Sequence, residues 1–119
     1  MEGRIRERKL LAETVVREIR NQVRAGKQPD RSELQTMSEL VAVYLPQFVE
    51  KLRQLYPSIS DDNILFCILT RLHFTPKEIA VALGISQQVV SNRRKRLNIC
   101  LFKKTAGTMR FAYNIHHLA

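Results

Sequence analysis

One polar segment, residues 87–98 (QQVVSNRRKRLN), contains the residue types best suited to binding chemistry. Its amide and hydroxyl side chains come first, and its basic side chains follow. Amides and hydroxyls hydrogen-bond the edges of bases, whereas Lys and Arg bind phosphates and guanine. We therefore predict base contacts on duplex DNA from Gln87, Gln88, Ser91, Asn92 and Lys95. We predict phosphate contacts from Thr75, Lys77, Arg93, Arg94, Arg96, Lys103 and Lys104.

The residues around this segment predict the elements that would position it. Thr75-Pro76-Lys77-Glu78 has the pattern of a capping box, so a helix should begin at Pro76. Gly84 should end that helix, because glycine adopts a positive φ at little cost. Ser86 should cap a second helix over residues 87–101. Two short helices joined by a glycine turn form a helix-turn-helix.

The charge pattern of the second helix bears on its role. A helix that only faces solvent usually mixes acids with bases, but residues 87–101 contain no Asp or Glu. This favours a helix that reads DNA over a structural corner. One alternative stays open: a helical protein-interaction or dimerisation module, in which the helix-turn-helix is structural.

The stretch FTPKEIAVALGISQQVVSNRRKRL resembles the LuxR/GerE-type helix-turn-helix DNA-binding domain, which is related in shape to sigma-factor region 4. The match covers residues 58–102, and KEIAVALGIS is its most specific part. Val89 and Arg93 stand where that family usually has Thr and His. The resemblance implies a bacterial transcription regulator. It also suggests that this chain is the C-terminal output part of a larger regulator, with the rest of that regulator or RNA polymerase as a partner.

The spacing of apolar side chains predicts one amphipathic helix over residues 2–26. Ile5, Ala12 and Ile19 recur every seven residues, with Val16 and Val23 beside them. Two interpretations stay open: a coiled coil between two chains, or a helix packed on its own domain. Because this stripe is longer than so small a domain should cover, we predict a homodimer held by these helices.

Further helices are predicted from near Ser32 to Tyr56, with a kink or a restart at Pro46, and from a cap at Ser60 to about Leu72. The last of these is apolar nearly all round, so we expect a buried hub. The sequence thus predicts an all-α fold, with a helical linker or dimerisation region over residues 1–56 and a helix-turn-helix domain over residues 57–119. The expected core of the second region is Ile64, Ile68, Ile79, Leu83, Ile85, Val90 and Leu97.

The tail is compatible with two structures. Thr108 would cap a short helix over residues 109–118, whereas residues 109–115 would alternatively form a strand over the domain. Lys103, Lys104 and Arg110 add positive charge to the tail in both cases.

Composition narrows the functional class further. The formal net charge is +9, and residues 61–119 hold nine basic against three acidic groups, which suits a polyanionic partner. We find no glycine-rich phosphate loop and no nucleophile beside a base, so we expect neither an enzyme nor a cofactor. Cys67 and Cys100, read as reduced thiols, point to the cytoplasm, and the histidines add no recognised metal-ligand spacing. The longest apolar run, Ile64–Leu69, is too short for a membrane span, so no membrane contact is expected.

Overall fold

The computed structural model describes residues 2–103 and 109–118, and at residues 2–4, 11, 12 and 109 only their backbone. All regular elements in these ranges are helices: α1 (Glu2–Ala12), α2 (Thr14–Arg24), α3 (Arg31–Tyr44), α4 (Pro46–Leu55), α5 (Asp61–Arg71), α6 (Pro76–Leu83), α7 (Gln87–Phe102) and α8 (Met109–His116). The predicted all-α fold is confirmed. The tail forms helix α8, so the alternative strand is wrong; the cap predicted at Thr108 lies outside the described residues.

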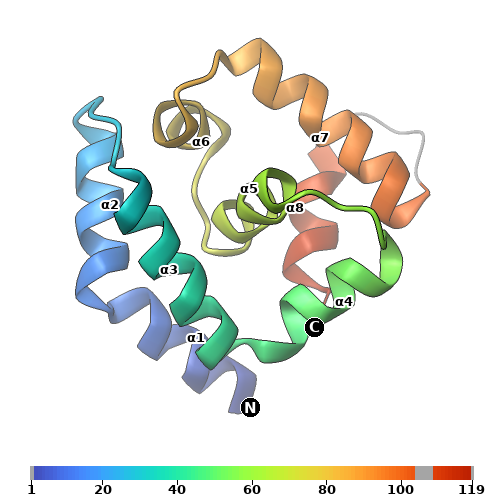
Figure 1. The fold of residues 1–119 in the computed structure, drawn as a ribbon, viewed down its shortest axis with the longest axis horizontal. Helices are drawn as coiled ribbons and strands as arrows, with labels where there is room; N and C mark the ends of the chain where they lie inside the picture. Colours follow the sequence, from blue (N-terminus) through green and yellow to red (C-terminus); the bar gives the residue numbers. More distant parts are fainter. Residues whose placement is uncertain (1, 104–108, 119) are drawn as a thin grey trace.

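Helix α5 lies at the centre of the molecule, and the other helices surround it (Figure 1). Helices α1, α2 and α3 run along one side, while α4 and α7 lie on the other (Figure 1). Helix α5 contacts α3, α6 and α8 directly. The predicted hub is therefore present, and the two helices of the helix-turn-helix are held on its periphery.

The sequence explains why α5 begins where it does and why it is buried. The Ser60 hydroxyl accepts a hydrogen bond from the Asn63 N–H at 3.2 Å, as the predicted cap requires. Asp61 and Asp62 follow in the first turn, where the positive end of the helix dipole favours carboxylates. Every residue from Phe66 to Leu72 is buried, so no side of this part of the helix faces solvent.

The N-terminal segment differs from the single helix that the sequence predicts. The helix is interrupted at Glu13, whose backbone is extended with φ −60° and ψ 141°. This residue separates α1 from α2. The Glu13 carboxylate accepts a hydrogen bond of 2.6 Å from the Tyr44 hydroxyl at the end of α3. The break lets Leu10 on α1 and Val16 on α2 both reach the core, where each is fully buried.

The apolar stripe of this segment packs inside the chain. Val16, Ile19 and Val23 are buried, and α2 lies against α3 and α6. Ile5 is 55% exposed, and the side chain of Ala12 lies outside the described residues. The expectation that the domain is too small to cover this stripe is therefore wrong for Val16, Ile19 and Val23, which are buried, whereas Ile5 stays exposed. A homodimer stays a prediction, but these three residues are not available to its interface.

The bounds of helices α3 and α4 agree closely with those predicted from the sequence. Helix α3 begins at Arg31, slightly before the predicted start at Ser32, because the Asp30 N–H donates to the Glu33 carboxylate at 3.1 Å. Pro46 is the first residue of α4, so of the two predicted outcomes the helix restarts at this residue. The buried side chains on both sides of the predicted boundary at residue 56 form one hydrophobic cluster. The described residues on the two sides of this boundary thus share a core.

Both cysteines are free thiols, and they differ in burial. Cys67 is a buried free thiol whose pKa is raised by burial, and Cys100 is a half-buried free thiol. Within the described ranges, none of the helices combines the length and apolar character needed to cross a bilayer.

Ile79 provides a test of the core. Ile79 is fully buried, so Ile79→Ala should lower the free energy of unfolding by about 2–5 kcal/mol. Ile99 on α7 is 53% exposed, and the same substitution there should change it by less than about 0.5 kcal/mol. Urea unfolding followed by circular dichroism measures both values. Equal losses in the two variants would show that Ile79 is not a core residue.

Candidate nucleic-acid interface

The start of α6 is fixed by the predicted capping box. The Glu78 N–H donates to the Thr75 hydroxyl at 3.1 Å, and the Thr75 N–H donates to the Glu78 carboxylate at 2.8 Å. Pro76 occupies the first turn, where its missing N–H is not needed. Thr75 and Lys77 are exposed at this end of the helix, so both predicted phosphate contacts lie on the surface.

The turn between α6 and α7 also has the predicted geometry. Gly84 adopts the left-handed conformation, with φ 65° and ψ 37°, and the Ile85 N–H returns to the Ala80 carbonyl at 3.0 Å. The Ser86 hydroxyl then accepts from the Val89 N–H at 3.1 Å and caps α7. Leu83 and Ile85 are only partly buried, whereas the rest of the predicted core is buried.

The predicted base-reading residues lie on the outward side of α7. Gln87, Gln88, Asn92 and Lys95 are exposed, and Ser91 is half-buried at the edge of this surface. The Gln88 amide donates to the Asn92 side-chain carbonyl at 3.1 Å. We call Gln88, Asn92 and Lys95 the polar face of α7, because their spacing of three and four residues places them on one side of a helix.

The predicted phosphate contacts on α7 separate into different environments. Arg94 is only 8% exposed, and its guanidinium lies 5.7 Å from the centre of the Phe111 ring on α8. Burial lowers the pKa of Arg94. The prediction that Arg94 reaches DNA is therefore wrong. Arg94 lies on the side of α7 that carries Val90 and Leu97, and α8 covers that side.

The remaining basic residues are more accessible. Arg96 and Lys103 are exposed, whereas Arg93 is half-buried beside a cavity described below. Lys104 lies outside the described residues. Among the phosphate contacts predicted within the helix-turn-helix, Lys77 and Arg96 are thus the fully exposed basic side chains.

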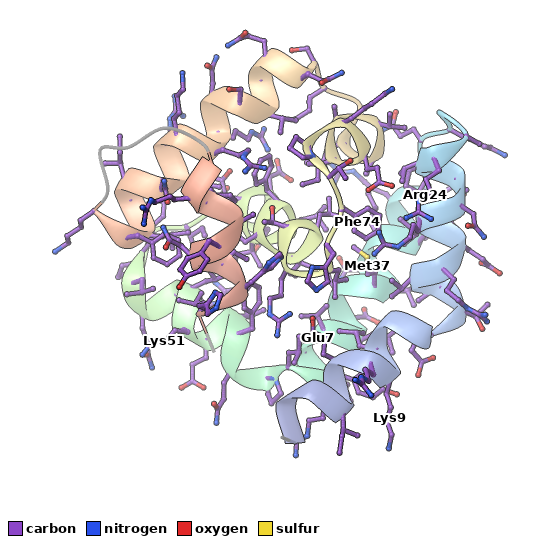
Figure 2. The ribbon with its side chains drawn as sticks, turned by 180° about the vertical axis from the view of Figure 1, so that it is seen from behind. Glu7, Lys9, Arg24, Met37, Lys51 and Phe74 are labelled. Carbon is purple, nitrogen blue, oxygen red and sulfur yellow. The ribbon has the colours of Figure 1, made fainter. Side chains whose placement is uncertain are left out.

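Sequence reasoning missed the support that α2 gives to α6. The Arg20 guanidinium donates to the Leu72 carbonyl at 2.6 Å and lies 4.3 Å from the centre of the Phe74 ring. Arg24 forms an ion pair of 3.1 Å with Glu78, the capping residue of α6. Figure 2 shows Arg24 and Phe74 on this side of the molecule. The spacing of four residues between the two arginines was the available signal, but it did not identify their partners.

Comparisons with known proteins returned nothing: no family model, no curated protein and no solved structure matches this chain.

The turn can be tested with a pair of glycines. Gly84 and Gly26 have φ of 65° and 75°, and a Cβ on Gly84 would lie 2.8 Å from Gln28 Oε1, whereas a Cβ on Gly26 would meet nothing within 4 Å. Because Gln28 is exposed and its amide can swing away, the backbone conformation should dominate both substitutions. Gly84→Ala and Gly26→Ala should each lower the free energy of unfolding by about 1–2 kcal/mol. A Gly84→Ala protein as stable as the parent would contradict the turn.

The capping carboxylate makes stability depend on pH. Burial alone would raise the pKa of Glu78, but hydrogen bonds from the Thr75 N–H and Arg24 outweigh it and hold the pKa below its usual value of 4.5. Since the pKa is lowered on folding, its contribution is present above pH 4.5 and is lost as the pH falls through the folded-state value.

Glu78→Gln should therefore be less stable than the parent by about 1 kcal/mol at neutral pH, with the gap narrowing as the pH falls below 4.5. Urea unfolding across this pH range measures the gap. The control is Glu50→Gln on α4. Because Glu50 is exposed, this variant should be as stable as the parent throughout the pH range. A gap for Glu78→Gln that does not change with pH would rule out the ionised carboxylate as its source.

Proposed function

We propose that this chain is a transcription regulator that binds duplex DNA in the major groove through residues 87–98 of α7. One observation carries the proposal: Gln88, Asn92 and Lys95 form an exposed polar face on the second helix of a helix-turn-helix, and α7 contains no acidic residue. A helix fits the major groove, and amide and basic side chains are the groups that read bases there.

The polar face has a preferred target among the bases. Because the Gln88 amide donates to Asn92, the Gln88 carbonyl and the Asn92 amide remain to pair with a base. These supply one acceptor and one donor, which complement the donor N6 and the acceptor N7 of adenine. The proposed site therefore contains an adenine opposite Gln88 and Asn92. Lys95 follows on the same face and suits a guanine or a phosphate.

The assembly and the setting belong to the same proposal. A bacterial cytoplasmic regulator of the LuxR type would act as a homodimer or as the output part of a larger regulator, with RNA polymerase as a further partner. Helix α8 covers the buried side of α7, so a dimer would form through other surfaces of the chain.

A second candidate function rests on two exposed apolar residues of α7. Ile99 is 53% exposed and Val89 is 38% exposed. DNA provides little apolar surface beyond the thymine methyl group, so these side chains fit a protein partner better than a groove. A protein-interaction module in which the helix-turn-helix is structural would use these two side chains, and Ile99 lies four residues after Lys95 on the same stripe of α7 as the polar face.

Selection of bound sequences from random duplex DNA, followed by titrations of variants at several salt concentrations, tests the DNA-binding proposal. Gln88→Ala and Asn92→Ala should weaken binding to the selected site by about 1–3 kcal/mol and relax its adenine preference. Lys77→Ala and Arg96→Ala should weaken selected and scrambled DNA alike and reduce the salt slope by about one each.

Lys51 supplies the matched control for the basic variants. It is exposed on α4, on the edge of the molecule away from α6 (Figure 2). Lys51→Ala should bind both DNAs like the parent. If the two amide variants and the two basic variants also bind like the parent, α7 is not the reading helix and the protein-interaction module becomes the better proposal.

A further inference from the structure

A cavity of about 660 Å³ lies among α3, α5 and α6, with residues of α4 and α7 at its sides. Leu34, Leu65 and Leu83 contribute apolar wall, and Leu65 and Leu83 are only partly buried, so apolar surface remains open to a ligand. Sites for small molecules in proteins have volumes of about 300–1,000 Å³ and are lined by apolar residues with a few polar groups. The cavity has this size, and its wall combines these apolar residues with a larger share of polar groups.

The charged groups around the cavity are three arginines and two aspartates. Arg93 of α7 is half-buried in its wall, and neither Arg93 nor Arg31 makes an ion pair within the part of the chain that the structure describes. Arg53 makes a long ion pair of 3.9 Å with Asp61. The side chain of Asp61 is 97% exposed, and Asp62 is also exposed, so both carboxylates lie at the outer rim.

We propose that this cavity binds a small amphipathic anion: a short aliphatic or aromatic body that ends in a carboxylate. The apolar body would lie against the leucines, and the carboxylate would take a bidentate hydrogen bond from the Arg93 guanidinium. Arg93 is the anchor because it is the most enclosed of the three arginines, and a half-buried guanidinium gains more from a paired anion than an exposed one. This inference does not depend on DNA binding.

The ligand chemistry is tested with two probes of similar length and opposite charge. Octanoate and octylamine each contain eight carbons, and the first is an anion and the second a cation. Each is titrated into the full chain while the backbone amides are followed by NMR. Octanoate should give saturable shifts at Leu65, Leu83 and Ile85 and should bind at least about tenfold more tightly than octylamine.

Two substitutions on α3 locate the site. Ser38 lines the cavity, so Ser38→Phe should place a ring inside it and weaken saturable binding of octanoate. Val43 lies on the same helix but is 72% exposed, so Val43→Phe adds the same ring outside the cavity and should bind octanoate like the parent. Arg93→Gln keeps the wall and removes the charge. It should lose about tenfold in octanoate affinity and leave octylamine unaffected.

Several results would overturn the proposal. Equal affinity for the two probes would contradict the preference for an anion. Octanoate binding by a folded Ser38→Phe protein with the parent's affinity would contradict the assignment to this cavity. If Ser38→Phe does not fold, unchanged octanoate affinity in Arg93→Gln decides against the site by itself. Shifts at the same amides that depend on protein concentration without probe would show that a second copy of the chain occupies the surface instead.

Discussion

Helix α5 has no solvent-facing side from Phe66 to Leu72, and the positions of the other helices depend on this burial. A helix that is apolar all round must be covered on every side, so α3, α6 and α8 each lie against it. Burial of apolar surface stabilises a fold by about 25 cal/mol per Å². This favours the observed arrangement over any in which one neighbouring helix is detached from α5. The helix-turn-helix is therefore held against α5 and is not a separate unit on a tether.

The buried end of α5 leaves polar groups that need partners. The last carbonyls of a helix have no bond within it. The Leu72 carbonyl accepts from Arg20 of α2, and the Thr70 carbonyl lies 2.8 Å from His116 Nε2 of α8, a ring whose pKa is lowered chiefly by burial. Arg71 is buried as well and pairs with Glu7 of α1 at 2.7 Å. Side chains from both ends of the chain thus satisfy one helix end, and Figure 2 shows Glu7 directed toward it.

The same packing sorts the side chains of α7 into distinct surfaces. Helix α8 covers one side, where Arg94 lies near Phe111 and the Asn114 amide donates to Asn98 at 3.1 Å. Arg93 borders the cavity, and the polar face of Gln88, Asn92 and Lys95 stays exposed. Adjacent arginines thereby acquire different tasks: one supports the fold, and its neighbour is available to a ligand.

The sequence by itself determined the local features, because each depends on residues a few positions apart. Caps at Ser60, Thr75 and Ser86, the turn at Gly84 and the polar face of α7 all follow from hydrogen bonds or dihedral angles within one turn of helix.

Only the tertiary structure decided what depends on distant partners. The break at Glu13 is held by Tyr44, the stripe of α2 is covered by α3 and α6, and Arg94 is enclosed by α8. Side-chain periodicity shows that a helix face is apolar or basic, but whether that face meets its own chain, a second chain or DNA depends on where the remaining helices pack. The burial of α5 sets that packing, and it brings together residues that lie up to 66 positions apart.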